Sequence, residues 1–155
     1  SIEYMTAAGK EAGFTPVFKN TAWDGIFAGL SANKYDAIVS SVSITEERKK
    51  AMDFSEPYYT VRQALIVPKT STAKSLADLK GQKVGGQIGT TCHFAIKAAE
   101  GAEATSYDEV GLAMEDLNVG RIAAVVCDDP VAANYALDKY KETLKIATVI
   151  ETGEA

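Results

Sequence analysis

Three apolar runs of the sequence each lead directly into side chains that could bind a small polar ligand. The first run is followed by Ser40, Ser41 and Ser43, the second by Gln87, Thr90 and Thr91, and the third by Asp128. Arg48 adds a guanidinium shortly after the first group. Hydroxyls and a guanidinium attract a carboxylate, the guanidinium through two parallel hydrogen bonds, whereas an aspartate attracts an ammonium group. Together these groups would suit a zwitterionic ligand.

Each of these residues also has an ordinary structural interpretation. Ser43 begins the sequence Ser-Ile-Thr-Glu, which fits a capping box, so Ser43 could be a helix cap and Arg48 a surface residue of that helix. Asp128 or the aspartate after it could cap a helix that starts at Pro130, because proline is favoured in a first helical turn. Trp23 lies in a loop-like segment and could belong to the core or pack against a ligand. The residues alone leave these alternatives open.

Catalysis, metal binding and nucleic-acid binding are not predicted. His93 is the only histidine, and its neighbour Cys92 would point about 100° away from it on a helix, so the two do not form a nucleophile–base pair. One histidine without clustered ligands does not indicate a metal site, and no phosphate-binding glycine motif occurs. A net charge of −5 argues against a nucleic-acid partner. We therefore expect no enzyme and no cofactor, with His93 at the surface or at the rim of a site.

The two cysteines, Cys92 and Cys127, are too few for a disulfide framework. They could form one bridge or remain two buried or half-buried thiols. The sequence contains no apolar run of the roughly 18 residues needed to cross a bilayer, and its first residues do not have the pattern of a signal peptide. A mature secreted protein would have such a sequence, and so would a cytosolic one.

Helical and strand-like segments alternate along almost the whole chain, which indicates an α/β fold. Helices are expected at residues 1–12, 24–30, 43–50, 75–79, 91–100, 108–118 and 130–140. Strands are expected at residues 16–18, 36–40, 59–67, 83–87, 103–107, 121–127 and 144–150. This order predicts parallel sheets with crossover helices, and ligands bind beyond the carboxyl ends of the strands in such sheets. The polar groups described first follow strand ends, so the fold would gather them in one cleft.

Residues 67–74 contain a proline followed by serines and threonines, and they are the best candidate for a crossing between two lobes. The first lobe would then consist of residues 1–66 and the second of residues 75–150, each rather small for an independent domain. Residues 151–155 would begin a return crossing.

Several ordered motifs resemble those of one known family. They lie at residues 34–38, 43–50, 52–59, 75–81, 83–85, 89–91 and 125–130. With them the sequence resembles, over nearly its whole length, the polar amino-acid-binding proteins of ABC importers, which are the solute-binding proteins of family 3. The resemblance implies a two-lobed, periplasmic-binding-protein-like fold of type II, with the ligand between the lobes. Compared with that family the chain is expected to be truncated at both ends, and Ala123 stands where an aspartate is usual.

The resemblance also implies a role for each candidate residue. The α-carboxylate of the ligand would be bound by Arg48, helped by Ser41, Ser43 and Thr91. The α-ammonium group would be bound by Asp128, and the ligand side chain would pack on Trp23. The same cleft would be lined by Ser40, Gln87 and Thr90.

The implied function is to bind a free amino acid and deliver it to an ABC-transporter permease. The doublet of Ser40 and Ser41 is most similar to members that bind lysine, arginine, ornithine or histidine, so a polar or basic ligand is expected. The location would be periplasmic or extracellular and membrane-associated, and the complete protein would be a monomer. Two alternatives share the fold: the ligand-sensing domain of a membrane receptor or kinase, and a dehydratase-type enzyme with an added acid or base in the cleft.

Overall fold

The computed structural model describes residues 1–154, and for residues 151–154 it describes only the backbone. The chain divides into two compact units, Ser1–Tyr59 and Thr60–Ala155. This boundary lies earlier than the crossing expected at residues 67–74, because residues 61–68 form an inner strand of the second unit. A return crossing was expected at residues 151–155. The backbone up to Glu154 continues the last strand, and residue 155 lies outside the described residues.

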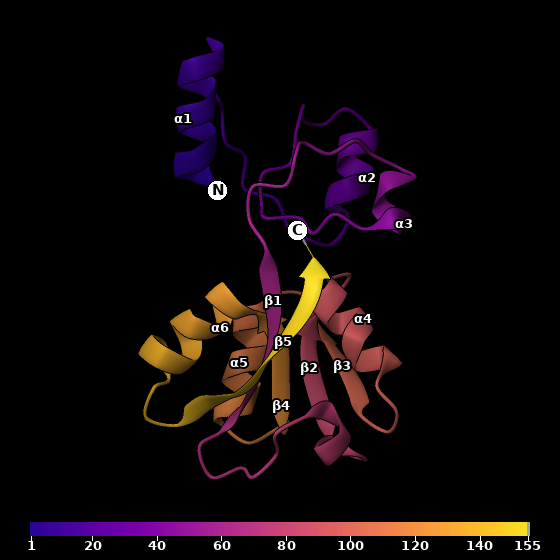
Figure 1. The fold of residues 1–155 in the computed structure, drawn as a ribbon, viewed down its shortest axis with the longest axis vertical. Coiled ribbons are helices and arrows are strands. Elements are labelled where there is room, and N and C mark those ends of the chain that lie inside the picture. Colours follow the sequence, from indigo (N-terminus) through magenta and orange to yellow (C-terminus); the bar gives the residue numbers. More distant parts are fainter. Residues whose placement is uncertain (155) are drawn as a thin grey trace. The chain divides into compact units, whose positions relative to one another are not determined.

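The first unit contains the helices α1 (Ile2–Ala12), α2 (Ile26–Ser31) and α3 (Glu46–Lys49), joined by long irregular segments (Figure 1). Helix α1 ends at Ala12, as expected, and is capped by Gly13, whose φ of 82° lies in the left-handed region that glycine adopts readily. The strand predicted at residues 36–40 does not form: residues 1–59 are all described and contain no strand. An apolar run becomes a strand only when another segment supplies ladder hydrogen bonds, and none of the described segments does so here.

The second unit is a five-stranded sheet in the order β3-β2-β4-β1-β5 (Figure 1). Its strands are β1 (Val61–Pro68), β2 (Lys83–Gln87), β3 (Glu103–Tyr107), β4 (Ala124–Asp128) and β5 (Leu144–Glu154). Strand β2 is parallel to β3 and β4, whereas β1 is antiparallel to β4 and β5. The sheet is therefore mixed, and the predicted parallel arrangement holds only for its β3-β2-β4 part.

Helices cover both faces of this sheet. They are α4 (Thr91–Ala98), α5 (Val110–Asn118) and α6 (Asp129–Asn134), with short helical turns at Leu76–Leu79 and Tyr135–Lys139. One face packs Leu65 and Val126 with Ile96 of α4, and the other packs Ile66 and Val125 with α5 and α6. Successive strand residues point to opposite faces, so one buried strand supplies both cores.

The two cysteines are free thiols, because the sheet separates them. Cys92 of α4 is buried on one face, and Cys127 of β4 is buried on the other. This arrangement excludes the alternative of one disulfide bridge. Burial, together with the nearby charges of Asp128 and Asp129, raises the pKa of the Cys127 thiol, which keeps it protonated.

Helix α4 packs unusually close to β2, because Gly86 has no side chain. A Cβ atom at Gly86 would lie 2.9 Å from Ile96 Cδ1 and 3.2 Å from the Cα atom of His93. His93 is consequently buried, with 3% of its surface exposed, so the prediction of a surface or rim position was wrong. Burial, and then the charge of Lys97, lower the pKa of His93, and its Nδ1 atom has no hydrogen-bond partner among the described residues.

Candidate functional site

Arg48 lies in the single turn of α3, and Thr45 caps that turn. The backbone N–H of Arg48 donates to Thr45 Oγ1 at 3.2 Å. The prediction of a capping box that starts at Ser43 is therefore wrong. In such a box Glu46 would be the third helical residue, whereas it is the first residue of α3. Ser43 is instead buried, and its carbonyl oxygen accepts a hydrogen bond from Arg48 Nη1 at 2.9 Å. The local turn thus brings the guanidinium back onto the segment that precedes it.

Two aromatic rings hold the guanidinium from the side of α2. The Cζ atom of Arg48 lies 5.0 Å from the ring centre of Phe27 and 5.8 Å from that of Trp23. The two rings meet edge to face, with 5.4 Å between their centres. A cation over aromatic faces is attracted by about 0.5–1 kcal/mol for each ring at a partly exposed site. Sequence reasoning missed Phe27, although it lies one helical turn after Trp23, the spacing that places two rings on one side.

Ser40 and Ser41 lie on the exposed segment that leads into Ser43. Ser41 has a φ of 49°, in the left-handed region that residues other than glycine rarely adopt. Such backbone strain clusters at ligand-binding and active sites, which is consistent with a functional role for this segment. Within the first unit, the structure therefore brings Trp23, Ser43 and Arg48 together and leaves the serine doublet at the surface.

Thr90 and Gln87 have structural roles at the start of α4. Thr90 is the N-cap: its Oγ1 accepts from the backbone N–H of His93 at 3.2 Å and donates to the Gln87 carbonyl at 2.7 Å. The Gln87 side chain donates from Nε2 to the carbonyl of Asp108 at 3.0 Å, which ties the end of β2 to the loop after β3. These bonds fix the first turn of α4 beside the carboxyl end of β2.

The next two residues of α4 bind side chains of the sheet. Thr91 Oγ1 accepts a hydrogen bond from Gln63 Nε2 at 3.4 Å, and the thiol of Cys92 donates to Asp128 Oδ1 at 3.4 Å. Gln63 on β1 is paired directly with Asp128 on β4 in the antiparallel ladder, so their side chains share one face of the sheet. The structure thus brings Thr91 and Asp128 together, and it adds Gln63 and Cys92, which sequence reasoning missed. The one available signal was a polar residue at an inward position of a buried strand.

The two adjacent aspartates after β4 have different partners. Asp129 forms an ion pair with Arg62 of β1, with 2.8 Å between Arg62 Nη2 and Asp129 Oδ2, and it also accepts from the Arg62 backbone N–H at 3.2 Å. Asp128 occupies the N-cap position of α6, yet within residues 1–154 its side chain makes no capping hydrogen bond to that helix. The capping alternative for Asp128 is therefore not supported, and Asp128 points to the α4 face instead.

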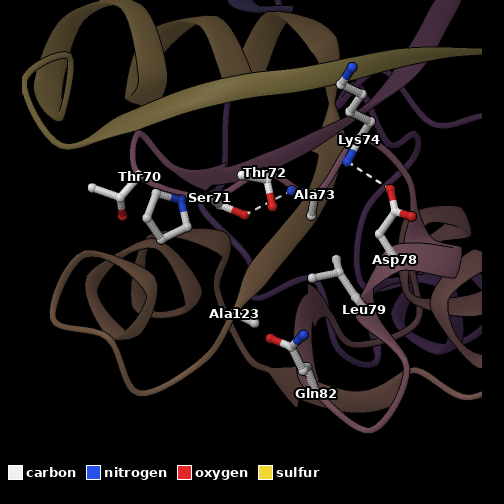
Figure 2. Close-up of a pocket in the computed structure, with 10 residues that line it drawn as sticks. Thr70, Ser71, Thr72, Ala73, Lys74, Asp78, Leu79, Gln82 and Ala123 are labelled. Carbon is white, nitrogen blue, oxygen red and sulfur yellow. Dashed lines mark hydrogen bonds between the residues drawn. The ribbon is translucent and has the colours of Figure 1, made fainter.

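A separate hollow of about 510 Å³ lies in the second unit, around the start of β4 and the segment after β1 (Figure 2). It is lined by Pro68, Thr70, Ser71, Thr72, Ala73, Lys74, Asp78, Leu79, Gln82 and Ala123. Its one carboxylate already caps a turn: Asp78 accepts from the backbone N–H groups of Lys74 and Ser75, and the bond from Lys74 lowers the pKa of Asp78. In Figure 2 the Lys74 side chain extends away from Leu79, Gln82 and Ala123. None of the predicted ligand-binding residues lines this hollow.

Other kinds of site receive no support from the described part of the chain. It contains no group of three or more histidine, cysteine, aspartate or glutamate residues that could hold a metal ion. Nor is any helix in residues 1–154 both long and apolar enough to span a membrane.

Comparison with known proteins identifies the family. Residues 1–150 match the family described as bacterial extracellular solute-binding proteins, family 3. The chain belongs to this family. Among family 3 relatives, a probable histidine-binding protein of Neisseria gonorrhoeae is 33% identical over 96% of the chain. The L-cystine-binding protein TcyJ of Escherichia coli K12 is 35% identical over 99% of the chain. The chain spans 57% of the length of each of these two relatives.

A solved structure has the same fold. An ancestral arginine-binding protein bound to arginine superposes with a TM-score of 0.93 and is 38% identical, over 99% of this chain and 70% of that one. The predicted family and the predicted α/β, periplasmic-binding-protein-like fold are thereby confirmed. The relatives named above are described as amino-acid-binding proteins.

Proposed function

We propose that the protein binds a free amino acid and delivers it to an ABC-transporter permease, with Arg48 as the anchor for the α-carboxylate. The observation that carries this proposal is the environment of the Arg48 guanidinium, held between the Ser43 carbonyl and the rings of Trp23 and Phe27. An arginine oriented in this way presents its planar donors in one fixed direction, which suits the two oxygens of a carboxylate.

Within the second unit, Thr91 and Asp128 are the groups proposed for the same ligand. Asp128 would bind the α-ammonium group, and Thr91 would donate to the α-carboxylate. Their support is the shared face on which β1, β4 and the first turn of α4 meet.

A polar or basic amino acid is the proposed ligand class. The relatives include proteins named for histidine, cystine and arginine, and all three ligands carry polar or charged side chains. Trp23 would pack against the ligand side chain, and the strained segment at Ser40 and Ser41 would contact its polar end. Gln87 and Thr90 would form part of the wall through the loop that they stabilise.

We further propose that the protein has no catalytic activity, needs no cofactor and does not bind nucleic acid. It would act as a monomer outside the cytoplasm, in the periplasm or at the outer face of the membrane. Support for an extracytoplasmic location comes from the family description, which names extracellular proteins.

Calorimetric titration of the protein with each common amino acid, with cystine and with ornithine tests this proposal. We expect one stoichiometric site that prefers basic or polar ligands and does not bind the corresponding amines, which lack the α-carboxylate. Tight binding of an amine without a carboxylate would contradict the role proposed for Arg48.

A further inference from the structure

Gln63 is a buried amide beside two groups of the proposed site. Only 4% of its surface is exposed, and its Nε2 atom donates to Thr91 Oγ1 at 3.4 Å. A buried amide is costly unless it is hydrogen-bonded, and a hydrophobic residue would avoid that cost in a strand whose other buried residues are all apolar. We propose that Gln63 is a positioning residue that sets the direction of the Thr91 hydroxyl for ligand binding, an inference that rests on the proposed function.

The antiparallel pairing of β1 and β4 explains why Gln63 is the residue in this position. Strand β1 begins where β4 ends, so Gln63 stands opposite Asp128. The two side chains lie on the same face, and they hydrogen-bond to successive residues of α4, Thr91 and Cys92. Two neighbouring strands thus connect to the one helical turn that carries the proposed hydroxyl.

The backbone of that turn is already fixed without Gln63. Gly86 lets α4 pack closely on β2, and Thr90 caps the helix through bonds to Gln87 and His93. A threonine in a helix divides its population between two rotamers about the Cα–Cβ bond, so a side-chain hydrogen bond can decide between them. The bond from Gln63 favours one of the two rotamers.

Hydrogen-bond chemistry makes the chosen rotamer useful. The Nε2 atom of an amide can only donate, so Thr91 Oγ1 acts as its acceptor and the hydroxyl hydrogen points away from Gln63. A carboxylate can only accept, and it would need that hydrogen. Replacing the amide by an apolar side chain would remove the preference for this rotamer.

A double-mutant cycle in ligand binding tests the inference. Gln63→Leu keeps much of the side-chain volume and removes the donor, and Thr91→Val removes the hydroxyl and keeps the branched shape. We expect Gln63→Leu alone to weaken amino-acid affinity roughly fivefold, about the worth of one hydrogen bond. In the Thr91→Val background the same change should have less than a twofold effect. Equal losses in both backgrounds, with thermal unfolding recorded for each variant, would show a purely structural role and overturn the proposal.

A measurement without ligand separates this inference from the proposed function. The side-chain amide of Gln63 gives its own signals in a nitrogen–proton correlation spectrum, and Thr91→Val should shift them while Thr91→Ser leaves them in place. Unchanged signals in Thr91→Val would overturn the inference even if the protein binds amino acids. If the parent protein binds no amino acid, the proposed function fails, and the amide signals still report whether Gln63 bonds to Thr91.

Discussion

Removal of the Arg48 guanidinium gives the strongest test of the proposed ligand anchor. In Arg48→Ala the ligand carboxylate would lose a charged partner that makes two hydrogen bonds, which weakens binding by about 2–5 kcal/mol. This loss corresponds to a decrease in affinity of roughly 30-fold to several thousand-fold. The substitution also removes the bond to the Ser43 carbonyl at 2.9 Å and the ring contacts at 5.0 and 5.8 Å, so some stability will be lost with it.

Two further variants separate the loss of binding from a loss of folding. Arg48→Lys keeps the charge but not the planar fork, and we expect an affinity between those of the parent and Arg48→Ala. Lys49→Ala, one residue further in the same turn, removes an exposed cation that pairs with Glu46 at 2.8 Å, and it should leave affinity unchanged. Calorimetry and thermal unfolding of all three variants decide the matter. A folded Arg48→Ala protein whose affinity for its amino acid is within twofold of the parent's would refute the role of Arg48 as the carboxylate anchor.

Three other substitutions have expected outcomes. Asp128→Asn should weaken the binding of α-amino acids far more than that of their desamino analogues in calorimetry, and equal weakening would point to a structural role. Gly86→Ala should lower the melting temperature, because the new Cβ atom would lie 2.9 Å from Ile96 Cδ1; an unchanged melting temperature would mean that α4 can shift freely. The hydrogen bond from Arg121 lowers the pKa of Asp116 in the folded protein below its value in the unfolded chain. The ionised Asp116 therefore stabilises the fold at a pH above its unfolded-state pKa, and this stabilisation is lost as the pH falls through its folded-state pKa. Asp116→Asn should therefore destabilise the protein near neutral pH and match the parent in acid, as denaturant titrations at several pH values can show.

The elements of the second unit could be predicted because their signals are local. Residues 83–87 and 103–107 are strands with the expected bounds, and the helix expected at residues 108–118 ends at Asn118 as predicted. The direction of β1 could not be predicted, since a strand carries no local mark of whether its neighbours run parallel or antiparallel. The same limit explains residues 36–40: their apolar pattern suits a strand, but the ladder depends on a second segment.

The site was predictable as a set of residue types and not as a set of contacts. Arg48 was singled out for its charge beside small polar residues, but its ring contacts come from Phe27 of α2 and from Trp23 just before that helix, which only the fold brings close. Thr45 rather than Ser43 is the cap, and the sequence could not decide between them because both are hydroxyl residues near one helix start. Gln63 was missed because its partner, Thr91, lies on a different element and only the fold brings them together.

The pairing of β1 with both β4 and β5 also has a consequence for the order in which the chain is made. Of the five described strands β1 leaves the ribosome first, yet its Gln63 pairs with Ile150 of β5, the last of the five. At ordinary rates of synthesis, between about 4 and 17 s would pass before that partner exists. During this time Ala64, Leu65, Ile66 and Val67, which are fully buried in the finished sheet, are available for wrong pairing. A protein that is exported before it folds would have to be kept unpaired by a chaperone over just this apolar segment.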